Sequence, residues 1–297
     1  MDFKEYIKTR QDLVNDYLRY YLENRTSSDF PTLKEAVAYS LLSGGKRMRP
    51  ILAMAACEAT GGEGKKALPF GCALEMIHTF SLIHDDLPAM DNDDYRRNML
   101  TNHKVFGDAH AILAGDALLA ETFRMIADRS LYPDVSVERG MSVMREVAEA
   151  AGFCGMVGGQ SLDLLAENKK VDERAVHLIH LYKTARFIAA SVVTGGLVAG
   201  AGDASISALR RYGENLGLAF QIIDDILNEI GEPGKTGKSV GSDARRGKAT
   251  YPALFGIAES RRKAVEYTGL AIAALEPLGS SVSRLCEIAR YIVSRDR

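Results

Sequence analysis

The sequence contains 297 residues, of which 37 are basic and 39 acidic. This length accommodates one large domain or two small ones and can bury a sizeable core. Because the charges nearly balance, no overall field favours nucleic acid or an anionic membrane, and selective binding must come from local clusters.

Apolar residues at helical spacing begin at the N-terminus and recur along the chain. Residues 3–21 show this spacing first. Pro31 is placed to open a second helix that Gly44 and Gly45 close, and Pro50 to open a third that ends at the ATGG of residues 59–62. Further helices are expected over residues 68–86, 108–128, 134–165, 172–200, 204–230, 250–276 and 279–294.

These elements predict an all-α fold, a large helical bundle in a single domain over residues 1–297. No low-complexity linker or fixed-period repeat divides the chain. The segments AILAGDALLAETF and FIAASVVTGGLVAG are apolar around most of the helix, which indicates central, buried helices in one contiguous core. A bundle of this size offers a cavity between its helices as a ligand site.

The cysteines and the apolar runs indicate a soluble, cytoplasmic protein. Cys57, Cys72, Cys154 and Cys286 lie far apart, without zinc-ligand spacing, and are expected to be reduced and buried. The charged N-terminus lacks the apolar core of a signal peptide. The longest uncharged run, residues 187–202, is too short and glycine-rich for a membrane span.

The first acidic cluster, HDDLPAMDNDDYRR, follows an apolar helical run. Asp85 and Asp86 are expected at the helix C-terminus, where carboxylates oppose the helix dipole unless a cation compensates them. On a continuous helix Asp85 and Asp91 would lie about 240° apart in azimuth. Pro88 predicts a break that brings Asp91 back beside Asp85.

The chemistry of this cluster suits a magnesium-bound polyphosphate. Magnesium commonly takes one or two protein carboxylates and fills its octahedron with water and phosphate oxygens. Arg96 and Arg97, which follow directly, have guanidinium groups that fork onto phosphate. The alternative is a solvated acidic turn. A calcium EF-hand fits poorly, because the sixth position counted from Asp91 is Arg96 rather than glycine.

The second cluster, DDILNEIGEPGKTGKS, again follows an apolar helix. Asp224 and Asn228 are four residues apart and share a helix face. The glycine-lysine end is not a phosphate loop, because Glu232 stands where the Walker pattern needs glycine and a helix precedes it instead of a strand. Lys238 and Lys248 are either phosphate contacts on a flexible loop or ordinary surface lysines.

The two clusters, of forms DDxxxxD and DDxxN, resemble the aspartate-rich motifs of the trans-isoprenyl diphosphate synthases. GGKRMRP (44–50), His78, GMVGGQSLDL (155–164), the Lys183-Thr184 pair, Gln221 and GKATYP (247–252) also correspond, in the family's order. The chain departs from the pattern at Asn228, in place of a third aspartate, and at Asn98, where many relatives have glycine.

The resemblance implies the isoprenoid synthase fold and a head-to-tail condensation of an allylic diphosphate with isopentenyl diphosphate. Three magnesium ions would be held by Asp85, Asp91 and Asp224, with Asp86, Asp225 and Asn228 supporting them indirectly. The roles implied for other residues are diphosphate binding by Arg96, Lys183, Lys238 and Lys248, isopentenyl diphosphate binding by Lys46, Arg49, His78 and Arg97, and cation stabilisation near Lys183, Thr184 and Gln221. The family also implies a homodimer.

Product length is expected to depend on Phe80 and Ser81, one to one-and-a-half turns before Asp85. The Phe80 ring, roughly 7 Å down the helix from Asp85, would act as a floor. With the two-residue insertion in the first motif, this resembles the bacterial farnesyl type. A geranylgeranyl diphosphate synthase is the alternative, and for Phe80 the alternative is a plain core residue. Outside this activity, the rivals are a terpene cyclase and a non-catalytic subunit that modulates a partner synthase.

Overall fold

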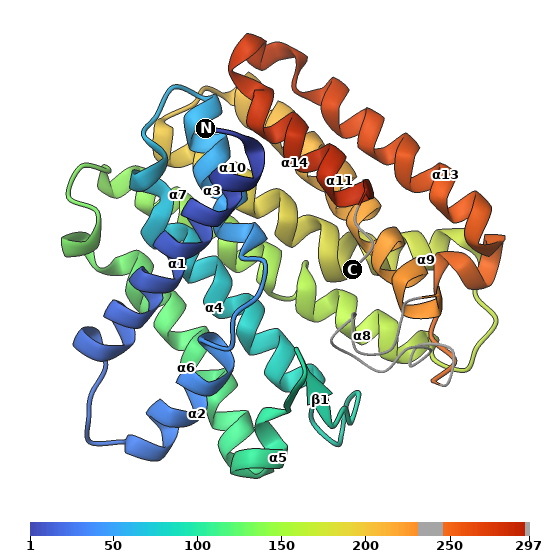
Figure 1. Ribbon diagram of the computed structural model, residues 1–297, viewed down its shortest axis with the longest axis horizontal. Coiled ribbons are helices and arrows are strands. Elements are labelled where there is room, and N and C mark those ends of the chain that lie inside the picture. The colour runs from blue at the N-terminus through green and yellow to red at the C-terminus, as the bar shows by residue number, and fades with distance from the viewer. Residues whose placement is uncertain (231–245, 295–297) are drawn as a thin grey trace.

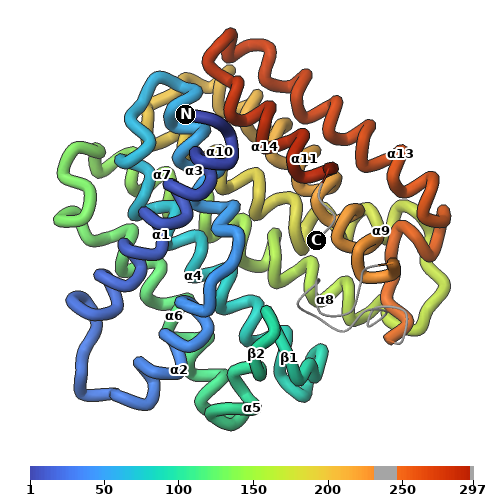
Figure 2. The backbone as a smooth tube through the Cα atoms, viewed as in Figure 1, coloured from blue at the N-terminus to red at the C-terminus, as the bar shows by residue number. Residues whose placement is uncertain are grey.

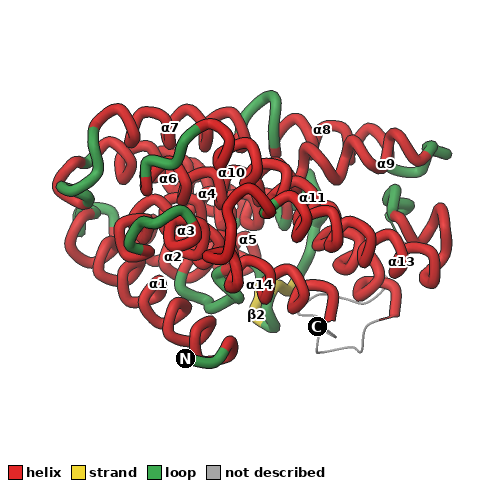
Figure 3. The backbone as a smooth tube through the Cα atoms, turned by 90° about the horizontal axis from the view of Figure 1, so that it is seen from above, coloured by secondary structure: helices red, strands yellow, loops and turns green. Residues whose placement is uncertain are grey.

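A computed structural model describes residues 1–230 and 246–294 of the chain. Most of this part is helical, as predicted, and Figure 3 shows that loops connect the helices and that strand is nearly absent from the described residues. The α-helices in chain order are α1 (Phe3–Arg25), α2 (Pro31–Leu41), α3 (Met48–Ala59), α4 (Leu68–Asp85), α5 (Asn102–Phe106), α6 (Asp108–Ala127), α7 (Val137–Ala151), α8 (Met156–Ala166), α9 (Glu173–His180), α10 (Arg186–Ala199), α11 (Asp203–Ile230), α13 (Tyr251–Ala274) and α14 (Ser283–Ser294).

Four short helical segments and two short strands complete the described elements. The 3₁₀ segments are η1 (Gly64–Ala67), η2 (Arg129–Leu131) and η4 (Glu276–Val282), and η3 (Leu181–Ala185) is a π-helical turn. Strands β1 (Tyr95–Arg96) and β2 (Met99–Leu100) pair antiparallel, with Tyr95 opposite Leu100. Among the described residues, no helix is both long and apolar enough to cross a membrane.

Side-chain caps fix where several helices begin. Asp2 accepts a hydrogen bond from the backbone N–H of Glu5 at the start of α1. Asp172 and Thr250 cap α9 and α13 in the same way. Such a cap satisfies a backbone donor that has no partner within the helix and stabilises it by about 1 kcal/mol. The cap at Thr250 sets the position of the chain that enters the pocket just before α13.

Helix α10 lies inside the bundle between α3 and α11 (Figures 1 and 2). Its residues 187–196 are all buried, which explains why the segment is apolar around the whole helix. Contact with α3 is close, because a Cβ atom on Gly195 would lie 2.0 Å from the carbonyl oxygen of Ala53. A larger residue at 195 would therefore push the two helices apart.

The buried apolar side chains form three clusters rather than the one contiguous core we expected. The first cluster joins α1, α2, α4, α6 and α7. The second lies among α3, α10, α11 and α14, and the third among α9, α11 and the start of α13. A pocket separates the first and third clusters, because Phe80 and Met90 of the first and Leu227 of the third all line it.

Several expected helix limits were wrong. The segment 134–165 is two helices, α7 and α8, because the chain leaves helical geometry at Gly152 and Gly155. The segment 172–200 is divided by the π-helical turn η3, and 279–294 begins with the 3₁₀ segment η4. Helix α3 begins at Met48, two residues before Pro50, which its first turn accommodates because the N–H groups there need no helical partner.

The cysteines are free thiols, as expected, but only Cys57 and Cys72 are buried. Cys286 is partly exposed, and Cys154 is exposed because it lies in the α7–α8 connection. The expectation of four buried cysteines was therefore wrong.

Asn98 has a clear role in the hairpin between β1 and β2. Arg97 and Asn98 form its two-residue turn with φ angles of 54° and 62°. Such a turn needs positive φ at both positions, and asparagine tolerates this conformation better than most residues. Asparagine can thus replace glycine here without disturbing the hairpin that carries Arg96 and Arg97.

Candidate active site

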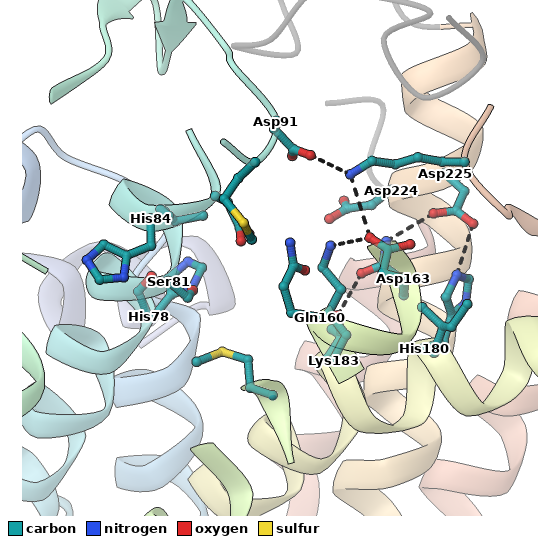
Figure 4. Close-up of a pocket in the computed structure, with 18 of the residues that line it drawn as sticks. His78, Ser81, His84, Asp91, Gln160, Asp163, His180, Lys183, Asp224 and Asp225 are labelled. Carbon is teal, nitrogen blue, oxygen red and sulfur yellow. Dashed lines mark hydrogen bonds and ion pairs between the residues drawn. The ribbon is translucent and has the colours of Figure 1, made fainter. Parts of the chain in front are cut away.

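A pocket of about 710 Å³ lies between α4, α8, η3, α11 and the stretch before α13. Figure 4 shows α4 with His78 and His84 on one side, and Gln160, Lys183 and His180 on the other. Of the site residues expected from the sequence, those that line the pocket are Lys46, Arg49, His78, Phe80, Ser81, Asp85, Asp91, Arg96, Arg97, Lys183, Thr184, Gln221, Asp224, Asp225, Asn228 and Lys248. Asp86 lies behind the pocket, and Lys238 lies outside the described residues.

The first wall of the pocket is the end of α4 and the loop after it, residues 85–97. Helix α4 ends at Asp85, and the chain turns within the next residues. The N–H of Asp91 donates a 2.8 Å hydrogen bond to the carbonyl oxygen of Asp85. The predicted break near Pro88 is confirmed, since it brings Asp91 back beside Asp85.

Asp86 points away from the pocket and holds Arg96. The guanidinium of Arg96 donates to both carboxylate oxygens of Asp86, at 2.7 and 2.6 Å. Burial by itself lowers the pKa of Arg96, but the hydrogen bonds and charge of Asp86 raise it above the usual value. Arg96 thus remains a fixed positive charge on the pocket surface.

The second wall combines η3 with one face of α11. Asp224 and Asn228 both line the pocket, one helical turn apart. The Thr184 hydroxyl donates to Gln221 Oε1 at 2.8 Å, and Gln221 Nε2 donates to Asp225 Oδ1 at 3.0 Å. These bonds fix which side of the Gln221 amide faces each neighbour.

Asp225 on the second wall is held by further neighbours. Its Oδ2 accepts from the backbone N–H of Tyr251 at 3.2 Å, and His180 Nε2 lies 3.3 Å from the same oxygen. The ring of Tyr251 packs against that of His180, with centroids 5.1 Å apart. Asp225 therefore ties the start of α13 to α11 and to the end of α9.

Two lysines meet at the buried carboxylate of Asp163 on α8. Lys183 Nζ donates to Asp163 Oδ2 at 2.6 Å, and Lys248 Nζ lies 3.6 Å from that oxygen. Burial raises the pKa of Asp163, but the two lysines outweigh it and the pKa lies below the usual value. The carboxylate stays ionised and gathers both lysines at the pocket surface (Figure 4).

Helix α8 approaches η3 closely because its contact residue is glycine. A Cβ atom on Gly159 would lie 2.1 Å from the backbone nitrogen of Lys183. The glycines of GMVGGQSLDL therefore allow α8 to bring Asp163 within hydrogen-bonding distance of Lys183.

A third group of cations surrounds His78 on α4. Burial, followed by the charges of Arg49 and Arg97, lowers the pKa of His78 well below its usual value. Burial likewise lowers the pKa of Arg49 to about 10, and its guanidinium lies 5.4 Å from the centre of the Phe187 ring. His78 is therefore neutral near pH 7, beside arginines that are still charged.

Arg47 of the same basic motif is structural. It is 1% exposed, pairs with Glu75 at 3.0 Å, and donates to Asn15 and to the carbonyl oxygen of Leu41. These contacts anchor the loop before α3. Lys46 at the end of this loop and Arg49 in the first turn of α3 both line the pocket.

The apolar end of the pocket contains Phe80, which is 9% exposed and packs edge-on against His84, with ring centroids 4.8 Å apart. The hydroxyl of Ser81 donates to the carbonyl oxygen of His78 at 2.9 Å. Phe80 and Ser81 thus both line the pocket, and Phe80 packs against His84 one turn along α4.

The sequence model of the family described as polyprenyl synthetase matches residues 30–271. The chain belongs to this family. Bacillus subtilis farnesyl diphosphate synthase is 41% identical over 98% of this chain and 97% of its own. Geranylgeranyl diphosphate synthase of Cyanophora paradoxa is 44% identical over 98% and 96%.

A solved structure supports the same assignment. The FPP/GFPP synthase of Zymomonas mobilis superposes with a TM-score of 0.86 and 34% identity, over 98% of this chain and 99% of that one. The fold of this polyprenyl synthetase is thus the isoprenoid synthase fold, and the chain is a prenyltransferase. The relatives' names differ in the product, so similarity alone leaves the product open.

The donors of this polyprenyl synthetase fit magnesium bound together with phosphate. Asp85, Asp91 and Asp224 all line the pocket. Within residues 1–230 and 246–294, no three His, Cys, Asp or Glu side chains converge on one point as in a closed metal site. Magnesium needs only one or two carboxylates when water and phosphate complete its shell. Gln160, whose buried amide atoms have no partner, offers one more polar contact in the same pocket.

Sequence reasoning gave no role to Gln160, Asp163 and His180, which line the pocket, or to Arg246, which contacts Asp91, although Gln160 and Asp163 lie in the GMVGGQSLDL motif. Asp163 could have been recognised as a lone carboxylate on an otherwise apolar stretch, SLDLL. Arg246 gave no such signal, because its role depends on where the chain before α13 meets the first wall.

Proposed function

We propose that this polyprenyl synthetase condenses isopentenyl diphosphate with dimethylallyl or geranyl diphosphate, head to tail, to give farnesyl diphosphate. The observation that carries the proposal is the pocket itself. It has carboxylates and cations on two facing walls, a separate arginine group near His78, and Phe80 at its apolar end.

The first step is heterolysis of the allylic C–O bond. Magnesium ions, three by the family resemblance, would be held by Asp85, Asp91 and Asp224 and would stabilise the negative charge of the departing diphosphate. Lys183 and Lys248 lie between these carboxylates, next to Asp163, and supply fixed positive charge to the same oxygens. Arg96, held by Asp86, supplies another positive charge. Lys238, which lies outside the described residues, stays a predicted diphosphate contact.

The second step is attack of the isopentenyl alkene on the allylic cation. Lys46, Arg49 and Arg97 bind the second diphosphate, while neutral His78 offers a hydrogen bond without adding charge. Thr184 and Gln221 oxygens face the path of the cation, and the remaining surface is mostly apolar, which keeps water away. The departing pyrophosphate takes the proton that restores the double bond.

Phe80 supports the farnesyl product. Phe80 lines the pocket five residues before Asp85, roughly 7 Å along the helix, where its ring would block a longer chain. The family contains members named for either product, so geranylgeranyl diphosphate is the alternative. Geranylgeranyl diphosphate would be the favoured product if the Phe80 side chain adopted another rotamer and left room for a longer chain.

Two other classes of function are less well supported. A terpene cyclase needs no site for isopentenyl diphosphate, whereas this pocket has the arginine group beside His78. A non-catalytic subunit needs no complete pair of aspartate walls, whereas both are present here. We further propose a homodimer, as the family resemblance implies.

One assay tests the proposal. The purified protein is incubated with magnesium, dimethylallyl or geranyl diphosphate, and labelled isopentenyl diphosphate, and the products are sized by chromatography after dephosphorylation. We expect a labelled C15 alcohol that disappears when magnesium is chelated. A C20 alcohol would show that the product is geranylgeranyl diphosphate instead of farnesyl diphosphate. A lack of any condensation would overturn the proposed activity.

A further inference from the structure

Arg246 contacts the first wall at the carboxylate we assign to a metal. One guanidinium nitrogen lies 3.0 Å from Asp91 Oδ1, and another lies 2.7 Å from Asp93 Oδ1. The second nitrogen also donates to the carbonyl oxygen of Asp91. Arg246 stands two residues before Lys248, so the chain leading into α13 brings two cations to one loop.

Lys248 contacts the same oxygen. Its Nζ lies 2.8 Å from Asp91 Oδ1, and the Asp91 side chain is only 5% exposed. A carboxylate oxygen has about two lone-pair sites, and here two cationic donors are directed at one oxygen. A divalent cation that binds Asp91 must therefore displace at least one of them or share the carboxylate with both positive charges.

The guanidinium is the stronger competitor of the two for geometric reasons. It spans Asp91 and Asp93 with different nitrogens, whereas the ammonium of Lys248 is a point charge shared with Asp163. The Arg246 side chain is also 23% exposed, so burial does not lock it in place and it can turn from the carboxylates toward another acceptor. Phosphate oxygens are a matching acceptor for such a fork.

We propose that Arg246 competes with the divalent cation for Asp91 and moves to the substrate diphosphate when both bind, so that metal and diphosphate bind cooperatively. The inference rests on the proposed function, which makes Asp91 a metal ligand. A diphosphate provides the acceptor that lets Arg246 leave Asp91 without losing its ion pair. Metal alone offers no such exchange and binds weakly.

The alternative is that Arg246 is only a structural tie between the first wall and the chain before α13. A tie of this kind keeps Asp91 in place for the metal. Its removal would then weaken metal binding, or leave it unchanged, with and without diphosphate. Competition predicts the opposite sign for metal alone, which separates the two roles.

The test is manganese binding to the full-length protein, measured from the EPR signal of the free ion, with and without saturating inorganic pyrophosphate. We compare the wild type with Arg246→Gln and Arg246→Lys. The control is Arg262→Gln, because Arg262 pairs with Glu259 on the exposed surface of α13. No allylic substrate and no turnover are involved.

We expect Arg246→Gln to bind manganese alone about fivefold more tightly, the scale of one partly exposed ion pair. The tightening of manganese binding by pyrophosphate should shrink about tenfold, and by linkage the tightening of pyrophosphate binding by manganese should shrink equally. Arg246→Lys should fall between, because one ammonium cannot span both carboxylates. Arg262→Gln should match the wild type.

Equal or weaker manganese binding by Arg246→Gln in the absence of pyrophosphate would overturn the proposal. Should that variant not fold, Arg246→Lys decides, and wild-type values for it would overturn the proposal as well. The condensation assay is separate. A wild-type protein that couples manganese to pyrophosphate but forms no prenyl product would refute the proposed function and leave this inference standing.

Discussion

The two walls of the pocket hold their carboxylates by different means. On the first wall the partners are cations, since Arg96 pairs with Asp86 and Lys248 with Asp91. On the second wall, the partners of Asp225 include the Gln221 amide and the Tyr251 backbone N–H. The cation that pairs with Asp91 at the pocket surface can exchange one partner for another, whereas hydrogen bonds from several neighbours fix the geometry of the buried Asp225 carboxylate. We therefore expect the first wall to rearrange on binding and the second to stay in place.

The largest effect should come from the metal ligand on the second wall. We expect Asp224→Asn to lower kcat/KM by about 10²–10³-fold, because the charge that stabilises the leaving group is lost. Asn228→Asp should stay within about tenfold of the wild type, since Asn228 acts through metal-bound water. Steady-state kinetics over a magnesium series provides the measurement. A greater loss from Asn228→Asp than from Asp224→Asn would contradict this division of roles.

Breaking the hydrogen-bond network around Gln221 should have the next largest effect. Gln221→Leu removes a partner from both Thr184 and Asp225, and unsatisfied buried groups cost about 1–3 kcal/mol each. We expect kcat to fall about 10–100-fold with little change in KM, together with a lower Tm. Asn215→Leu, on the same helix outside the pocket lining, serves as the control. Unchanged kcat in Gln221→Leu would show that the network does not position the reacting groups.

A substitution at Phe80 on α4 should alter the chain length of the product rather than the rate. Phe80→Ala is expected to shift the main product from C15 to C20 or longer, measured by chromatography of the dephosphorylated products. Ser81→Ala should shift it less, because its hydroxyl is turned back onto the His78 carbonyl. An unchanged product spectrum in Phe80→Ala would reduce Phe80 to an ordinary core residue.

The smallest effect concerns the pH dependence of stability. Burial and nearby arginines lower the pKa of His78, so the folded state leaves unbound a proton that the unfolded chain takes up below about pH 6.5. His78 therefore lowers the free energy of unfolding as pH falls below 6.5, by at most about 1.4 kcal/mol per pH unit. We expect His78→Gln to flatten this slope in urea denaturation at pH 7, 6 and 5 without metal. Equal slopes would count against a depressed pKa.

The first wall was easier to predict from the sequence than the second. Helix geometry shows that Asp85 and Asp91 can face one site only if the helix breaks between them. Pro88 provides that break within the same short motif. Asp163 and His180 reach the site only because α8 and α9 pack against η3 and α11. The local sequence marks Asp163 only as a lone carboxylate in an apolar stretch, and the partners of both residues depend on packing that the local sequence does not encode.

Helix limits failed for a related physical reason. Gly152 and Gly155 interrupt a continuous apolar pattern, and their backbone angles depend on how α8 docks at Gly159. The π-helical turn η3 has no signature in the spacing of apolar residues. In contrast, Pro31 and the caps at Asp2 and Thr250 act within three residues, where sequence patterns are most informative.

The π-helical turn η3 also works as a phase shift in the chain. Its wider ring holds one residue more than an α-turn, and each residue advances a helix by about 100°. His180 can therefore meet Asp225, while Lys183 and Thr184 line the same pocket from the next turn. Deleting one residue from this segment would keep nearly all of its side chains. It would also rotate Lys183 and Thr184 relative to α9, so that they no longer line the pocket. At this position, chain length is as much a determinant of the site as residue identity.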